Sequence, residues 1–177
     1  MPKKRSIRTW PGWLVVGTAF VVVLLDQLSK RWIERNLPIY ESIVPLPALR
    51  NFFTITHFTN TGAAFGLFRD QGVLFVVIAL VVIVTIIVYA RYLPIERRLV
   101  RFALGLQLGG AIGNNLIDRP RQGHVTDFIY FHFWPAFNIA DMAIVVGVAL
   151  LAYALLMQKD ETPKPAGVEP GDQPTSS

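Results

Sequence analysis

Four long apolar runs limit what this chain of 177 residues can fold into. A helix rises about 1.5 Å per residue and the hydrocarbon core of a bilayer is about 30 Å thick, so roughly 20 apolar residues can cross it. The chain is 53% hydrophobic and only 16% charged, and its apolar runs are too long for a soluble domain of this size. We predict an all-α membrane protein with four transmembrane helices, at about residues 13–32, 73–92, 99–117 and 137–157.

The first apolar run also resembles part of a secretory signal peptide, because Lys3, Lys4 and Arg5 precede the stretch from Leu14 to Leu25. No small-residue cleavage site follows that stretch. The sequence continues instead with Leu25-Asp26-Gln27-Leu28-Ser29-Lys30. We therefore interpret the run as a retained membrane anchor.

The basic residues predict which way the helices face, because cytoplasmic connections carry an excess of Lys and Arg. Ten of the 17 Lys and Arg residues precede the first run, surround the connection between the second and third, or follow the fourth: Lys3, Lys4, Arg5, Arg8, Arg91, Arg97, Arg98, Arg101, Lys159 and Lys164. Lys30, Arg31 and Arg35 lie just beyond the first run, on the predicted outer side, and so reduce the difference in basic residues between the two sides. We expect both termini in the cytoplasm. The net charge of +5 then reflects topology and attraction to anionic lipid, and no basic-aromatic module suggests a nucleic-acid partner.

The longest connection, at about residues 36–71, is predicted to form a small extracytoplasmic β-rich cradle between the first two helices. The stretch 52–59 alternates polar with apolar residues and is rich in β-branched and aromatic side chains, which favours one or two short strands. Such strands could rest on the membrane or pair with an extended peptide. Residues 1–158 would form one membrane domain, and the Pro/Gly/Ser-rich residues 159–177 a disordered cytoplasmic tail.

Two carboxylates, Asp127 and Asp141, flank a short aromatic connection at the edge of the last apolar run. A carboxylate at a helix centre costs roughly 2.5–3.5 kcal/mol on insertion scales, so both need a reason. Asn138 and Asp141 have the spacing of a helix capping box, which is a purely structural explanation for Asp141. It leaves Asp127, 14 residues earlier at the same predicted depth, unexplained.

Shared-proton chemistry would explain both carboxylates. Two carboxyls a few ångströms apart cannot both ionise cheaply, so the pair would hold a single proton near neutral pH. The ionised member can activate a water while the protonated member polarises a carbonyl, as in aspartic proteases. Because Asp141 opens a helix, it should be the more acidic, which makes Asp127 the expected proton carrier.

Other polar residues fall at the same predicted side of the membrane and should converge with the two aspartates, because successive spans alternate in direction. Asp118 and Arg119 are interpreted as a local ion pair or a cap network. The amides could hold a peptide backbone or orient the aspartates. These residues are Asp26, Lys30, Asn60, Asn115, Asp118, Arg119 and Asn138.

The sequence offers little for other chemistries. It has no cysteine, its three histidines lack zinc-site spacing, and no serine elbow is present, so we expect neither a catalytic metal nor a cysteine or serine nucleophile. The competing interpretation is a small proton- or cation-coupled transporter, or a membrane subunit, in which the carboxylates relay protons or bind cations.

Five segments, in this order, resemble the lipoprotein signal peptidases, the type II signal peptidases of bacteria (peptidase family A8). They are Asp26-Gln27-Leu28-Ser29-Lys30, Asn60-Thr61-Gly62-Ala63-Ala64-Phe65, Asn115-Leu116-Ile117-Asp118-Arg119, Gly123-His124-Val125-Thr126-Asp127-Phe128 and Phe137-Asn138-Ile139-Ala140-Asp141. The resemblance implies an intramembrane aspartyl endopeptidase with Asp127 and Asp141 as the catalytic dyad. Its substrate would be a diacylglyceryl-modified prolipoprotein, cut just before the lipidated lipobox cysteine.

The resemblance also implies roles for further residues and a location. It assigns substrate binding or dyad positioning to Asn60, Gly62, Asn115, Arg119, Asn138 and Ala140, and structural support to Asp26, Lys30 and Asp118. It implies a monomer in the bacterial cytoplasmic (inner) membrane, surrounded by phospholipids, with the site near the outer face and no cofactor.

One departure from the family pattern affects the third run. The family usually has Gly-Gly-Ala-x-Gly-Asn, then two residues and Asp-Arg, whereas here Gly113-Asn114-Asn115 contains an additional residue before Leu116-Ile117-Asp118-Arg119. Counting back from Asp118 favours Asn115 for the family role. Asn114 stays open, because one residue turns a helix face by about 100°.

Overall fold

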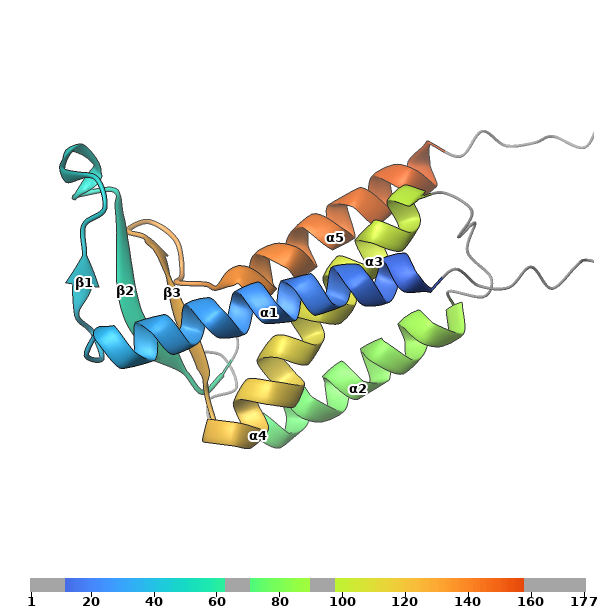
Figure 1. The fold of residues 1–177 in the computed structure, drawn as a ribbon, viewed down its shortest axis with the longest axis horizontal. Coiled ribbons are helices and arrows are strands. Elements are labelled where there is room, and N and C mark those ends of the chain that lie inside the picture. Colours follow the sequence, from blue (N-terminus) through green and yellow to red (C-terminus); the bar gives the residue numbers. More distant parts are fainter. Residues whose placement is uncertain (1–11, 63–70, 90–97, 158–177) are drawn as a thin grey trace, which may run out of the picture.

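A computed structural model describes residues 12–62, 71–89 and 98–157 of the chain (Figure 1). The predictions about the N-terminal basic residues and about a disordered tail at 159–177 lie outside these ranges.

A helix lies at each of the four predicted ranges. They are α1 (Trp13–Asn36), α2 (Gly72–Tyr89), α3 (Arg98–Ala111) with its continuation, and α5 (Ile139–Leu156). The helices run in alternating directions, and α1 begins and α5 ends at the same end of the bundle (Figure 1). Among the described residues, α1 and α5 are long and apolar enough to cross a membrane.

The helix α3 continues directly into a π-helical turn, η3 (Ile112–Asp118), and then into the short α4 (Arg119–Gln122). A π-helix makes i→i+5 hydrogen bonds and usually occurs as a single turn inside an α-helix. It therefore takes up one more residue per turn than an α-helix would. This turn contains Gly113-Asn114-Asn115, the place where the sequence has its additional residue.

The described strands form one antiparallel sheet, in the order β1-β2-β3, at the end of the molecule opposite the start of α1 (Figure 1). The strands β1 (Ser42–Ile43) and β2 (Phe53–Asn60) come from the predicted cradle region, with a 3-10 turn, η1 (Pro47–Leu49), between them. The third strand, β3 (Val125–Phe131), comes from the connection before α5. The predicted cradle region thus supplies two strands of this sheet, and β3, which was not predicted, adds the third. β3 brings Asp127 opposite Phe58 of β2.

Small residues let α3 pack closely between α1 and α5. A Cβ on Gly109 would lie 2.8 Å from the carbonyl oxygen of Ala19 in α1. A Cβ on Gly110 would collide with the carbonyl oxygen of Ala140 at the start of α5. Close backbone approach through small residues is the usual way in which helices associate inside a membrane. Here it holds the first turn of α5 directly against the end of α3.

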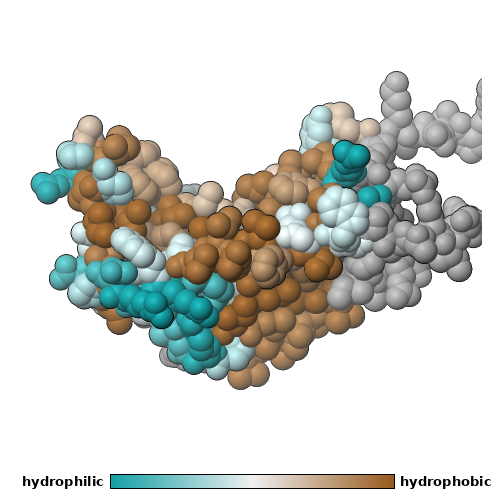
Figure 2. Space-filling view, viewed as in Figure 1, coloured by the Kyte–Doolittle hydropathy of each residue, from teal (hydrophilic) through white to brown (hydrophobic). Residues whose placement is uncertain are grey.

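The surface is strongly divided by polarity. Figure 2 shows hydrophobic residues over most of the helical part and a band of hydrophilic residues where α1 ends and α4 lies. Large apolar side chains face outwards along three of the helices, including Phe20 of α1, Val81 of α2 and Leu156 of α5, each at least 60% exposed. Such a continuous apolar surface is expected of a protein whose solvent is a bilayer.

Candidate active site

Asp127 is held in the middle of β3 and is buried, with 3% of its surface exposed. Its two oxygens accept hydrogen bonds from two different amides: Oδ1 from Asn138 Nδ2 at 2.7 Å and Oδ2 from Asn60 Nδ2 at 2.9 Å. Asn60, the last residue of β2, is itself fixed because its Oδ1 accepts from the backbone N–H of Gly62 at 3.0 Å. The sheet thus places both the carboxyl and one of its donors.

Asp141 lies in the first turn of α5, which begins with a complete capping box, as the Asn138 and Asp141 spacing predicts. The backbone N–H of Asp141 donates to Asn138 Oδ1 at 3.0 Å, and that of Asn138 donates to Asp141 Oδ2 at 3.2 Å. The other carboxyl oxygen, Oδ1, accepts from Asn114 Nδ2 at 2.7 Å. The capping role and a chemical role are compatible, because the cap fixes the carboxylate without covering it.

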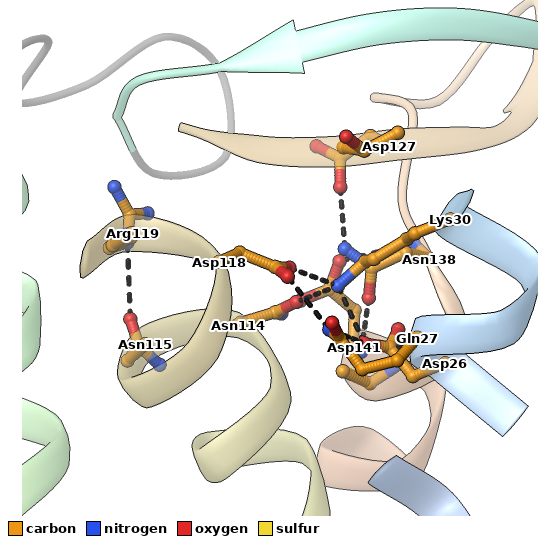
Figure 3. A network of polar contacts seen from close by, with 12 residues as sticks. Asp26, Gln27, Lys30, Asn114, Asn115, Asp118, Arg119, Asp127, Asn138 and Asp141 are labelled. Carbon is orange, nitrogen blue, oxygen red and sulfur yellow. Dashed lines mark hydrogen bonds and ion pairs between the residues drawn. The ribbon is translucent and has the colours of Figure 1, made fainter. Parts of the chain in front are cut away.

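One residue joins the two aspartates. Asn138 is fully buried, and its amide accepts from the backbone of Asp141 while it donates to the side chain of Asp127 (Figure 3). Both aspartates line the same cavity, of about 650 Å³. Its lining combines the two carboxyls with apolar side chains, including Met142 and Val145 of α5. A partly apolar ligand that fills the cavity would therefore meet both carboxyls.

Burial raises the pKa of Asp127 to about 7. The main cause is desolvation, and the negative charge of Asp141 adds to it. The hydrogen bonds from Asn60 and Asn138 act in the opposite direction, because they stabilise the carboxylate. Asp127 is thus a group that can hold or release a proton near neutral pH.

A cluster of buried charges lies behind the cavity wall. Lys30 Nζ donates to Asp26 Oδ2 at 2.7 Å and to Asp118 Oδ2 at 2.6 Å, and all three side chains are fully buried (Figure 3). Gln27 Nε2 donates to the other oxygen of Asp118 at 2.7 Å. The interpretation of Asp118 and Arg119 as a local ion pair or a cap network is therefore wrong, because the Asp118 carboxylate bonds Lys30 and Gln27 of α1 and makes no capping hydrogen bond to α4. In sequence the partners are 88 residues apart, so no local pattern indicates the contact.

Arg119 instead holds the segment after β2. Its Nη2 donates to the carbonyl oxygen of Gly62 at 2.7 Å and its Nη1 to that of Thr61 at 3.3 Å. Asn115 Oδ1 accepts from Arg119 Nε at 3.2 Å and so orients the guanidinium. Arg119, Asn115 and Gly62 all line the cavity.

The residues singled out in the sequence occupy two layers. Those that line the cavity are Asn60, Gly62, Asn115, Arg119, Asp127 and Asp141. Those fully buried behind it are Asp26, Lys30, Asp118, Asn138 and Ala140. Ala140 contributes its backbone N–H, which donates to Asp26 Oδ1 at 3.0 Å and ties the start of α5 to α1.

Two further polar residues take part without having been assigned a role from the sequence. Gln27 bridges α1 to Asp118, and Thr126 Oγ1, beside Asp127, donates to Glu34 Oε1 at 2.8 Å. The signal for β3 itself was available, because Val125-Thr126-Asp127-Phe128-Ile129-Tyr130-Phe131 is rich in β-branched and aromatic residues. Within the described residues, no three His, Cys, Asp or Glu side chains are grouped so as to hold a metal ion.

Comparison with known proteins identifies the family. The profile of the family described as Signal peptidase (SPase) II matches residues 18–157. The lipoprotein signal peptidase of Moorella thermoacetica is 47% identical over 143 residues, which is 81% of this chain and 93% of the relative. That of Pseudomonas fluorescens is 41% identical over 157 residues, 84% of this chain and 89% of the relative.

Solved structures agree with these sequence matches. One bacterial membrane enzyme superposes with a TM-score of 0.73 at 30% identity, covering 88% of this chain and 94% of the other. A second superposes with a TM-score of 0.71 at 32% identity, covering 82% of this chain and 94% of the other. The residues matched by the family profile, 18–157, include every residue that lines the cavity. The chain therefore belongs to the signal peptidase II family, the lipoprotein signal peptidases.

Proposed function

We propose that this family member is an intramembrane aspartyl endopeptidase in which Asp127 and Asp141 form the catalytic dyad. The observation that supports the proposal most is that Asn138 bonds both carboxyls, Asp127 through its side-chain amide and Asp141 through its backbone N–H, and that both aspartates line one cavity. The raised pKa of Asp127 lets this carboxyl hold a proton near neutral pH, as one member of an acid/base pair has to do.

The dyad would work as follows. Asp141, ionised, takes a proton from a water that attacks the carbonyl carbon of the scissile peptide bond. Asp127, protonated, gives its proton to the carbonyl oxygen, which produces a neutral gem-diol. Asp141 then passes its proton to the leaving amine nitrogen while Asp127 takes one back from the gem-diol, so the C–N bond breaks and the dyad returns to its starting state.

The substrate we propose is a prolipoprotein cut just before a diacylglyceryl-modified cysteine. The apolar wall of the cavity formed by Met142 and Val145 suits acyl chains or an apolar signal peptide. Arg119 and Asn60 would hold the peptide backbone beside the dyad. All these contacts come from one chain, so the enzyme would act as a monomer surrounded by phospholipid.

We further propose that α1, α2, α3 with η3, and α5 all cross the bacterial inner membrane. Their alternating directions and apolar outer surfaces fit this arrangement. The sheet and the dyad would then lie near the outer face, with both termini in the cytoplasm.

The direct test is turnover of a diacylglyceryl-modified prolipoprotein by purified protein in detergent. We expect Asp127→Asn and Asp141→Asn each to lower the rate by at least about 10³-fold, because a dyad acts as a unit. Glu34→Gln is the matched control, since Glu34 is a carboxylate at the same level that bonds Thr126 outside the cavity. It should keep near-normal turnover. Near-normal turnover by either aspartate variant would rule out the dyad, and loss of activity on adding a chelator would point to a metal.

A further inference from the structure

Two adjacent amides in the π-helical turn have separate partners. Asn115 orients Arg119, as described above. Asn114 is buried at 6% exposure and lies between Lys30 on one side and Asp141 on the other. The additional residue of this chain thus lies within the π-helical turn η3. Because of it, the turn carries two amides with different partners, Asn114 and Asn115.

The donors around Asn114 fix how its amide is turned. An ammonium group can only donate, so the group 2.6 Å from Lys30 Nζ must be the amide oxygen. The amide nitrogen then points at Asp141 Oδ1, 2.7 Å away. The second oxygen of Asp141 accepts from the backbone N–H of Asn138. Both oxygens of Asp141 therefore face N–H donors, as those of Asp127 also do. The difference is that one donor to Asp141 belongs to an amide whose oxygen is bonded to an ammonium group, which makes it the stronger donor.

Asp26 and Asp118 pair with Lys30 and partly neutralise its charge, which weakens its direct electrostatic effect on Asp141. Lys30 does polarise the Asn114 amide, and hydrogen bonds in a chain strengthen one another. The charged groups around Asp141 are Lys30 and Asp26 from α1, Asp118 and Arg119 from η3 and α4, and Asp127 from β3. Among the described residues, Asn114 is the side chain that hydrogen-bonds both Lys30 and Asp141.

We propose that Asn114 is a positioning residue: it relays the charge of Lys30 to Asp141, keeps Asp141 as the ionised partner, and leaves the shared proton on Asp127. This inference rests on the proposed dyad and assigns the role of base to Asp141 and the role of proton donor to Asp127. Asn115 has a different task, which is to set Arg119 against the segment after β2.

The test is the pH profile of kcat/KM for Asn114→Ala in detergent with a lipidated prolipoprotein. The triad of Lys30, Asp26 and Asp118 stays paired in this variant, so we expect it to fold. Its kcat should fall about 10- to 100-fold, as expected for loss of a charge-assisted hydrogen bond. Its KM should stay within about twofold, and the acidic limb of the profile should move up by about one pH unit.

Two further variants sharpen the result. Asn114→Asp keeps the shape and the oxygen that faces Lys30 but loses the donor to Asp141, so its acidic limb should move up at least as far, and it tests the relay even if Asn114→Ala fails to fold. Asn115→Ala is the matched control, and it should change KM through Arg119 while its acidic limb stays at the wild-type position.

A wild-type acidic limb in both Asn114 variants would overturn the relay. So would an equal shift in Asn115→Ala. Neither result would affect the dyad, whose failure would appear separately as turnover by Asp127→Asn or Asp141→Asn.

Discussion

The amides around the two aspartates share one design. Asn60, Asn114 and Asn138 each have their oxygen fixed by a group that can only donate, namely a backbone N–H or the Lys30 ammonium. Each therefore has to present its N–H to a carboxyl. Donors fixed in this way need no rearrangement as charge moves between the carboxyls, which is the condition for electrostatic preorganisation.

The raised pKa of Asp127 has a consequence for stability. In the unfolded chain the group titrates near 3.8 and in the folded protein near 7, so folding binds a proton between these values. Its contribution to stability is present below about pH 4 and is lost as the pH rises to about 7. The loss is on the order of a few kcal/mol, at 1.36 kcal/mol per pKa unit.

Asp127→Asn removes this titration. In detergent, we expect the thermal midpoint of the wild type to fall relative to that of the variant as the pH rises from about 4.5 to 7.5, by several degrees at roughly 2–4 °C per kcal/mol. Comparing how the two thermal midpoints change with pH removes any pH-independent effect of the new amide on stability. Glu34→Gln should follow the wild type, and parallel curves for Asp127→Asn and the wild type would show that Asp127 does not titrate in this range.

At the scale of elements, the site depends on how closely α3 approaches α5. Gly110 lies against the carbonyl oxygen of Ala140, one residue before Asp141, so any side chain at this position moves the start of α5. We expect Gly110→Ala to destabilise the protein by about 1–3 kcal/mol, as overpacking does. The same displacement should lower kcat, because Asp141 would lose its register with Asn114.

The matched control is Gly17→Ala. It is also a glycine in a helix, but a Cβ there would meet nothing within 4 Å. It should leave turnover unchanged and keep or slightly raise the thermal midpoint, since alanine favours a helix over glycine. Equal effects of the two substitutions on turnover and melting would argue against close packing at Gly110.

The strand β3 shows the limit of local reasoning about elements. Its composition favours a strand, but it is only seven residues long and lies in a short connection between two apolar helices, which favours a loop. It becomes a strand because β2 offers an unpaired edge, to which residues from Phe53 to Asn60 contribute. That pairing is non-local and decides the position of Asp127.

At the scale of the whole molecule, the polar and apolar surfaces predict how the chain sits in a membrane. The apolar helical surface and the hydrophilic band near α4 are separated along the long axis (Figure 2). With the sheet at one end and the start of α1 at the other, the molecule has two distinct faces (Figure 1). The distribution of Lys and Arg predicts that the sheet end faces outwards.

The absence of cysteine from the sequence makes this orientation simple to measure. We expect a membrane-impermeant thiol reagent to label Arg50→Cys, an exposed position between η1 and β2, in intact spheroplasts. Thr162→Cys should be labelled only after the membrane is permeabilised. Activity of both variants should be checked, and the reverse labelling pattern would place the dyad at the cytoplasmic face.

The sequence by itself determined the helices, the capping box at Asn138 and Asp141, and the residues of the site, because apolar run length, cap spacing and short motifs are local properties of a chain. Only the tertiary structure decided the contacts of those residues. Asp118 pairs with Lys30, 88 residues away, and not with its neighbour Arg119. The strand β3 pairs with β2. Buried charges and unpaired strand edges have to find partners wherever packing brings them, and local sequence does not encode that distance.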